Sequence, residues 1–148
     1  MNNFHNNVNN LARALAIDFG KIRSGIAVTD EMKIIASGLT TVATPKLMDF
    51  LKEYLATEDV DVIVVGKPLQ MDNSASESEA LIVPFVKALQ QTFPSLMIER
   101  VDERFTSKMA MQSLIDSGMK KKHRSNKALI DEISATIILQ TYLNSAHQ

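Results

Sequence analysis

The sequence contains no cysteine. This absence excludes a disulfide scaffold, a thiolate metal site and a thiol nucleophile. Long apolar runs are also missing, because the longest uninterrupted aliphatic stretch covers residues 62–65, whereas a membrane-spanning helix needs roughly 20 apolar residues. The first residues carry neither a basic region nor an apolar core, so we expect no signal peptide. These absences predict a soluble protein of the cytoplasm.

Neither sign of charge is in excess, but the charges are unevenly distributed. Sixteen basic residues face seventeen acidic ones, a net charge of −1, which argues against a nonspecific coat for nucleic acid. Within residues 120–127, called the basic segment below, there are five basic residues and no acidic one: Lys120, Lys121, Lys122, Arg124 and Lys127. Without these five, eleven basic residues face seventeen acidic ones. The basic segment could hold a polyanion, although a solvated charged loop is the alternative interpretation.

A length of 148 residues predicts a single domain. Apolar residues make up 45% of the chain and charged residues 22%, which is ordinary for a globular protein and excludes disorder throughout. The Asn-rich start offers almost nothing to bury, so we expect residues 1–11 to form a disordered extension. The domain itself is expected to cover residues 12–144, followed by a tail at residues 145–148.

The first half of the chain predicts strands and then a helix. Short apolar or alternating stretches, joined by short turns, predict three consecutive antiparallel strands at residues 13–18, 24–30 and 34–42. Thr44 and Pro45 predict a helix N-cap followed by proline at the first helical position, and helical periodicity continues to about residue 56. A β-branched run at residues 61–66 then predicts a strand that is buried on both faces.

The second half alternates helices and strands. A capping box formed by Ser76 and Glu79 predicts a helix that runs to about residue 91. Because Pro84 is unfavourable inside a helix, this helix either kinks or begins near Pro84. A further strand and two helices are expected at residues 97–101, 107–117 and 127–144. This order predicts an α/β fold with a five-stranded mixed sheet, three antiparallel strands followed by strand-helix alternation, and helices on both faces.

Acidic residues stand at three places in this pattern. Asp18 ends the first strand, the pair Asp102 and Glu103 ends the fifth, and Asp131 lies inside the apolar last helix. Each has an ordinary alternative explanation. Asp18 could form a turn, Glu103 could make a surface ion pair with a neighbouring arginine (Arg100 or Arg104), and Asp131 could bond to buried backbone.

The acidic residues can also be interpreted as one site. Ser134 and Ala135 follow Asp131 by one helical turn, and such small residues would let the helix lie close to the sheet beside the carboxylate. Three oxygen-bearing anions, without cysteine or a well-placed histidine, suit Mg²⁺ or Mn²⁺. A paired metal site of this kind can activate water and stabilise the leaving oxygen in phosphodiester hydrolysis. The basic segment just before Asp131 would hold the polyanion beside these metals.

Four blocks of the sequence resemble one known family. Residues 16–20 read Ala-Ile-Asp-Phe-Gly and are followed by Arg23, Gly25 and Ala27. The other blocks are residues 65–72 (VGKPLQMD), residues 102–107 (DERFTS), and the basic segment with Asp131 and residues 138–143 (ILQTYL). Occurring in this order over residues 13–144, they resemble the YqgF-type family, whose members are named as Holliday junction resolvases or pre-16S rRNA nucleases. The chain departs from the family pattern at Asn73, at Ser134 and around Arg23.

The resemblance implies an RNase H-like fold and a hydrolase of the metal-dependent nuclease type. Carried over by position, the catalytic and metal-binding acids are Asp18, Glu103 and Asp131, with Mg²⁺ or Mn²⁺ as the cofactor, and Asp102 is the less favoured member of its pair. Arg23 and the basic segment would bind nucleic-acid phosphates through Arg23, Lys120, Lys121, Lys122, Arg124 and Lys127. Lys67 could add a phosphate contact, although an exposed loop lysine is the simpler interpretation.

The resemblance leaves the substrate open. We favour processing of the 5′ end of pre-16S ribosomal RNA, with a Holliday junction in DNA recombination and repair as the alternative. A non-catalytic nucleic-acid-binding module of the same fold is a further alternative, but it predicts a lost carboxylate. A sugar-kinase or actin-like ATPase begins with a similar Asp-x-Gly hairpin, but it needs two such domains, and 148 residues supply one.

Overall fold

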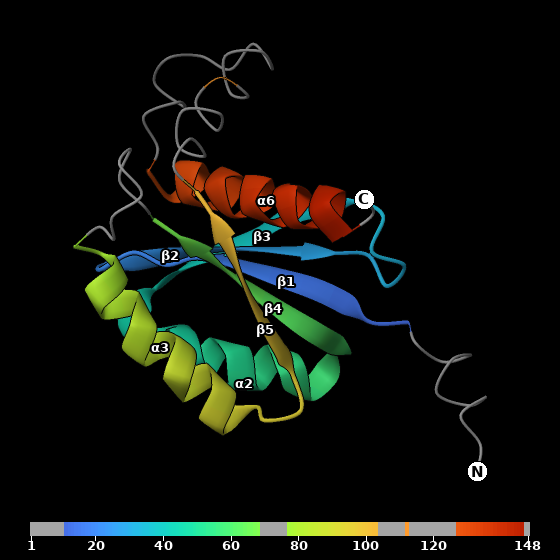
Figure 1. Ribbon diagram of the computed structural model, residues 1–148, viewed down its shortest axis with the longest axis horizontal. Coiled ribbons are helices and arrows are strands. Elements are labelled where there is room, and N and C mark those ends of the chain that lie inside the picture. The colour runs from blue at the N-terminus through green and yellow to red at the C-terminus, as the bar shows by residue number, and fades with distance from the viewer. Residues whose placement is uncertain (1–10, 69–76, 104–111, 113–126, 147–148) are drawn as a thin grey trace.

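A five-stranded sheet forms the centre of the molecule (Figure 1). The computed structural model describes residues 11–68, 77–103, 112 and 127–146. Within them the strand order is β3-β2-β1-β4-β5, so the first strand of the chain lies in the middle of the sheet. The α/β class and the mixed sheet are as expected, and the arrangement agrees with the RNase H-like fold implied by the resemblance.

The strands follow the predicted order closely. β1 (Arg13–Asp18), β2 (Arg23–Thr29) and β3 (Ala36–Ala43) form an antiparallel meander. β4 (Val60–Lys67) then pairs parallel to β1, and β5 (Met97–Asp102) pairs parallel to β4. The predicted burial of β4 is confirmed, because its central residues 62–66 are all buried. β1 and the parallel strands therefore end at the same edge of the sheet.

Helices cover both faces of the sheet (Figure 1). The 3₁₀ turn η1 (Thr44–Lys46) leads into α2 (Leu47–Thr57), which lies with α3 (Glu79–Thr92) on one face. α6 (Lys127–Ala146) lies alone on the other face among the described residues, mainly against β2, β3 and β1. Of the predicted helix at residues 107–117, all but residue 112 fall outside the described residues. No helix in the described part of the chain is long and apolar enough to cross a membrane.

The two faces of the sheet differ in side-chain size. Large residues such as Leu15, Ile17 and Ile63 pack against α2 and α3. Beneath α6, the sheet contributes Ala14, Ala16 and Ala27, together with valines of β4. Small side chains let the axis of a helix approach the strands, so the alanine-rich face allows α6 to lie close to the sheet.

Two of the predicted helix starts are wrong. The hydroxyl of Thr44 does not cap a helix; it donates to the carbonyl of Gly20 at 2.6 Å, because η1 packs against the β1–β2 turn. α3 begins at Glu79 with Ser78 at the N-cap and no side-chain cap, so the capping box is wrong, and Glu79 instead binds an arginine of β5. Pro84 lies inside α3, and the helix therefore does not begin there.

Candidate active site

Asp18 stands at the end of the central strand. It is the last residue of β1 and pairs with Gly25 on β2. Ala14 and Ala16 belong to the apolar cluster beneath α6, and Asp18 continues their alternation along β1. The Asp18 side chain is therefore directed to the α6 face of the sheet, at the edge where the parallel strands end.

α6 approaches this edge closely because β2 has a glycine there. A Cβ atom built on Gly25 would overlap the carbonyl group of Asp131 and would lie 2.9 Å from the amide nitrogen of Glu132. The residues one turn later, Ser134 and Ala135, are both buried against the sheet. The close approach that these small residues predicted is thus confirmed, and it brings Asp131 to the same edge as Asp18.

Glu103 reaches the site from the far side of β4. It directly follows β5, and its amide donates to the carbonyl oxygen of Lys67 at 3.1 Å. A Cβ atom on Gly66 would overlap the Glu103 carboxylate and lie 2.8 Å from the Cδ1 of Ile138. The carboxylate therefore lies directly over the Cα of Gly66, on the α6 face. Asp102, by contrast, is exposed.

The three carboxyl groups are electrostatically coupled. Burial raises the pKa of Asp18 from 3.8 to about 7, and the negative charge of Asp131 raises it as well. Burial likewise raises the pKa of Glu103 from 4.5 to about 8, with the charge of Asp18 as the next largest cause. Asp18 therefore interacts with both other acids: the charge of Asp131 acts on Asp18, and the charge of Asp18 acts on Glu103. Strongly raised carboxyl pKa values in a cluster are typical of functional sites.

Arg23 lies inside this group rather than apart from it. Its Nε donates to the carboxylate of Asp131 at 2.5 Å, from the first residue of β2 to α6. The sequence predicted Arg23 as a phosphate ligand, and the ion pair with Asp131 was not foreseen. Because guanidinium carries five N–H donors, one bond to Asp131 leaves capacity for a further anion.

The turn that carries Arg23 is tied down by hydroxyl groups. The Gly20 amide donates to the Oγ of Ser24 at 3.3 Å, and Ser24 shares a hydrogen bond of 2.8 Å with Thr44. The Thr44 amide also donates to the carbonyl of Ile22 at 2.9 Å. The β1–β2 turn is therefore fixed on η1, which orients Arg23 beside the carboxylates. This network is long-range, and no local pattern in the sequence indicated it.

The remaining predicted residues lie outside this group or outside the described residues. Lys120, Lys121, Lys122 and Arg124 belong to the undescribed part of the chain, and Lys127 is the first residue of α6. Lys67 was expected in an exposed loop, but it is the half-buried last residue of β4. The correction follows from the length of β4, which extends one residue beyond the predicted run.

The three acidic residues of the candidate site offer only oxygen atoms to a metal ion. Asp18, Glu103 and Asp131 offer only carboxylate oxygens, which are the ligands preferred by hard divalent cations. As the side chains lie, no three His, Cys, Asp or Glu residues in the described ranges are gathered closely enough to hold a metal ion. The donor set fits such a cation in its chemistry, because a positive charge would offset both the burial and the mutual repulsion that raise the pKa values of Asp18 and Glu103.

Sequence reasoning missed two participants at this edge, Arg100 and Glu79. Arg100 was considered as a surface partner of Glu103, but its ion pair is with Glu79, at 2.7 Å between Nη2 and Oε1. Glu79 was assigned to a helix cap. The available signal was an arginine at position 100, in the half-buried middle of β5, where a charged side chain requires a partner.

Comparison with known proteins gives consistent similarities. Residues 12–145 match a family model described as "RuvX: Holliday junction resolvase". The chain is 59% identical over 133 residues to a protein of Christiangramia forsetii, covering 90% of this chain and 98% of that protein. It is 58% identical over 135 residues to a protein of Flavobacterium johnsoniae, covering 91% of this chain and 98% of that protein. Both proteins are named "Putative pre-16S rRNA nuclease".

Proposed function

The chain belongs to the RuvX family, whose model is described as Holliday junction resolvase, and from this premise we propose that it is a nuclease that hydrolyses phosphodiester bonds in nucleic acid with a divalent metal ion. The observation that carries the proposal is the coupling of three carboxylates at one edge of the sheet. Asp18 interacts with Asp131, and Glu103 interacts with Asp18. Half-buried acids that repel one another are unfavourable without a cation, so the arrangement supports a catalytic site rather than a structural one.

Asp18, Glu103 and Asp131 would hold Mg²⁺ or Mn²⁺ through their oxygens. When bound, such an ion activates water and stabilises the leaving oxygen of the phosphodiester. The strand ends and the close approach of α6 over Gly25 supply the fixed positions of the acids. The raised pKa values mean that the cation competes with protons for Asp18 and Glu103 near neutral pH.

Arg23 and the basic segment would bind the phosphate backbone. Arg23 is held at the site by its hydrogen bond to Asp131. A guanidinium has five N–H donors, so Arg23 could also donate to a phosphate oxygen. The basic segment runs up to the start of α6, the helix that carries Asp131. The densest positive charge of the sequence therefore lies only a few residues before a proposed catalytic acid. Phosphate contacts of this kind position the substrate and carry no sequence information.

We propose the 5′ end of pre-16S ribosomal RNA as the substrate. The names of the relatives, at 51–59% identity, support pre-16S rRNA as the substrate class. A single basic segment on an acidic body also suits one strand drawn across one site. The family description favours a second candidate, the four-way DNA junction. Junction resolution requires two sites acting on a symmetric substrate, so this candidate predicts a dimer as the active unit.

Cleavage assays on matched substrates test the proposal. The purified protein is given a ribosomal RNA precursor with its leader, a four-way DNA junction and linear duplexes, each with Mn²⁺, Mg²⁺ or EDTA. We expect metal-dependent cleavage of the RNA precursor by the wild type and by Asp49→Asn, a control whose side chain is exposed on α2. We expect no cleavage by Asp18→Asn.

The other outcomes separate the alternatives. Paired symmetric nicks in the junction, with intact RNA, would replace the RNA substrate by branched DNA. Binding of nucleic acid without cleavage of any substrate would contradict the nuclease proposal and favour a non-catalytic module.

A further inference from the structure

Arg100 makes an unusually complete set of hydrogen bonds close to the site. Its Nη1 and Nη2 donate to the two carboxylate oxygens of Glu79 at 3.0 and 2.7 Å, a bidentate pair between β5 and α3. Its Nε donates to the carbonyl of Val65 at 3.1 Å, and Nη2 also donates to the carbonyl of Gly66 at 3.0 Å. One guanidinium therefore joins α3 to the end of β4.

The end of β4 that Arg100 holds is the part that supports Glu103. The Glu103 carboxylate lies over the Cα of Gly66, where a Cβ would overlap it. The Glu103 amide donates to the carbonyl of Lys67, the next residue along β4. A shift of the β4 end would thus move both the backbone and the carboxylate of Glu103.

A purely stabilising role does not explain the Arg100–Glu79 ion pair well, because burying the two charges costs free energy. The side chain of Glu79 is only 10% exposed and that of Arg100 only 24% exposed. Desolvating an ion pair costs free energy that its attraction often fails to repay, so such pairs are weak evidence for a purely stabilising role. They are better explained where they fix one geometry, and here the geometry belongs to Glu103.

Charge supports the same assignment. Arg100 is the cation that lowers the pKa of Glu103, against the larger effects of burial and of Asp18. Glu79 acts in the opposite direction and more weakly. The guanidinium thus favours the ionised carboxylate that the proposed site requires.

Building on the proposed nuclease function, we propose that Arg100 is a positioning residue for Glu103. Arg100 is anchored by Glu79, and it acts by fixing the C-terminal end of β4. Arg100 itself does not need to contact the substrate. The proposal concerns the placement of one acid, so it predicts an effect on turnover rather than on substrate affinity.

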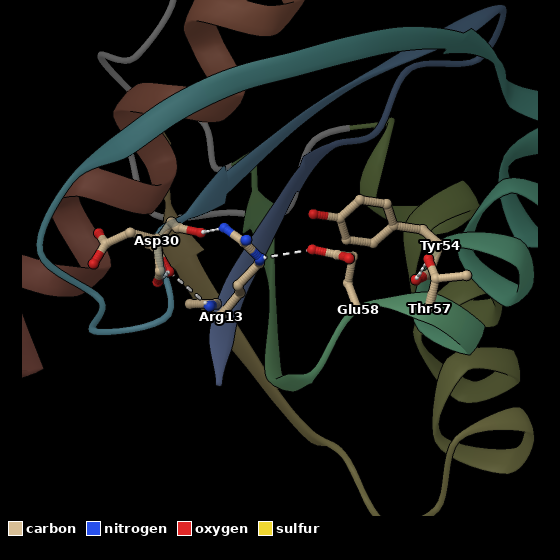
Figure 2. Close-up of polar contacts among 7 residues, drawn as sticks. Arg13, Asp30, Tyr54, Thr57 and Glu58 are labelled. Atoms are coloured by element: carbon tan, nitrogen blue, oxygen red, sulfur yellow. Dashed lines mark hydrogen bonds and ion pairs between the residues drawn. The ribbon is translucent and has the colours of Figure 1, made fainter. Parts of the chain in front are cut away.

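The opposite edge of the sheet offers a matched control. Arg13 of β1 donates through Nε to the carboxylate of Glu58, which follows α2, at 3.1 Å, and through Nη1 to the carbonyl of Thr29 at 2.9 Å (Figure 2). Arg13 therefore also joins a strand to a helix end and to a backbone carbonyl. It does so at the start of β1, whereas Asp18 is at the end of that strand.

The experiment compares Arg100→Lys and Glu79→Gln with Arg13→Lys and Glu58→Gln. Lysine keeps the charge but cannot make the forked bonds, and glutamine keeps the shape but loses the charge. We expect Arg100→Lys to lower kcat roughly tenfold with KM within about twofold of the wild type, since small misplacements of a catalytic group cost up to about a hundredfold. Glu79→Gln should lower kcat less, because the hydrogen bonds from Arg100 to the backbone carbonyls of Val65 and Gly66 persist. Arg13→Lys and Glu58→Gln should keep the wild-type kcat.

A second measurement does not depend on turnover. Calorimetric titration with Mn²⁺ alone should show weaker binding by Arg100→Lys than by the wild type, and unchanged binding by Arg13→Lys. Melting temperatures establish that each variant is folded at the assay temperature. If Arg100→Lys and Arg13→Lys lose turnover equally, or if Arg100→Lys raises KM alone, the positioning role is refuted. A wild type that neither cleaves nucleic acid nor binds Mn²⁺ would instead refute the nuclease function itself, and this inference with it.

Discussion

Replacing Gly25 by alanine tests whether the close packing of α6 creates the site. The added Cβ would overlap the Asp131 carbonyl group and lie 2.9 Å from the Glu132 amide nitrogen, whereas ordinary contacts begin at 3.4 Å. Both obstacles are backbone atoms, so no side-chain rotation relieves the overlap. To restore ordinary contact distances, α6 must therefore move away from β2 by about 1 Å at Asp131, or the strand must distort by as much.

This displacement predicts a loss of both stability and turnover. Overpacking of this kind costs typically about 1–3 kcal/mol, which for a chain of this size lowers the melting temperature by roughly 2–12 °C. A shift of about 1 Å between Asp131 and Asp18 should also lower kcat, by up to about a hundredfold. Thermal unfolding followed by circular dichroism and steady-state cleavage with saturating Mn²⁺ measure the two effects separately.

Gly38→Ala is the matched control on the neighbouring strand. Gly38 lies on β3 beneath the same helix, but a Cβ there would meet Glu132 at 3.4 Å and the Oγ1 of Thr136 at 3.5 Å, which are ordinary contacts. We expect Gly38→Ala to keep the wild-type kcat and nearly the wild-type melting temperature. The reasoning is refuted if the two alanine variants behave alike, or if Gly25→Ala unfolds more easily while cleaving at the wild-type rate.

Three further predictions concern the charges. Metal-dependent cleavage should be abolished by each of Asp18→Asn, Glu103→Gln and Asp131→Asn. Combining these substitutions should cause no additive loss, since one missing ligand disables the site. Loss of cleavage in Asp102→Asn instead would show that the wrong member of the Asp102–Glu103 pair was chosen. In EDTA, the wild type should lose stability as pH rises from about 4 to about 8, because folded Asp18 and Glu103, with pKa values of about 7 and about 8, retain protons that the unfolded chain releases. Asp18→Asn should therefore be more stable than the wild type at pH 8, by on the order of 4 kcal/mol, and no more stable at pH 4; equal denaturant midpoints at pH 8 would contradict this. Neutralising the five basic residues of the basic segment should reduce the magnitude of the slope of log K, where K is the binding constant for nucleic acid, against the logarithm of the salt concentration. The reduction should be roughly two if two or three of these residues contact phosphate, and an unchanged slope would indicate a solvated loop.

Local patterns in the sequence determined most of the described elements and indicated the acidic side chains of the candidate site. The β-branched run of β4 indicated burial on both faces, and short turns indicated the meander of β1, β2 and β3, because each pattern involves residues only a few positions apart. The same holds for Asp131, whose small neighbours Ser134 and Ala135 indicated a helix lying close to the sheet. Acidic residues at strand ends and in an apolar helix stand out without knowledge of their partners.

Partners far apart in the chain were decided only by the tertiary structure. Thr44 and Glu79 both stood where a helix cap was expected, but the hydroxyl binds Gly20 and the carboxylate binds Arg100. Arg23 pairs with Asp131 across 108 positions. The position of Glu103 over Gly66 likewise depends on the parallel register of β4 and β5. Hydrogen-bonding groups take whichever partner the packed strands and helices bring within reach, and that choice follows from the whole fold rather than from neighbouring residues.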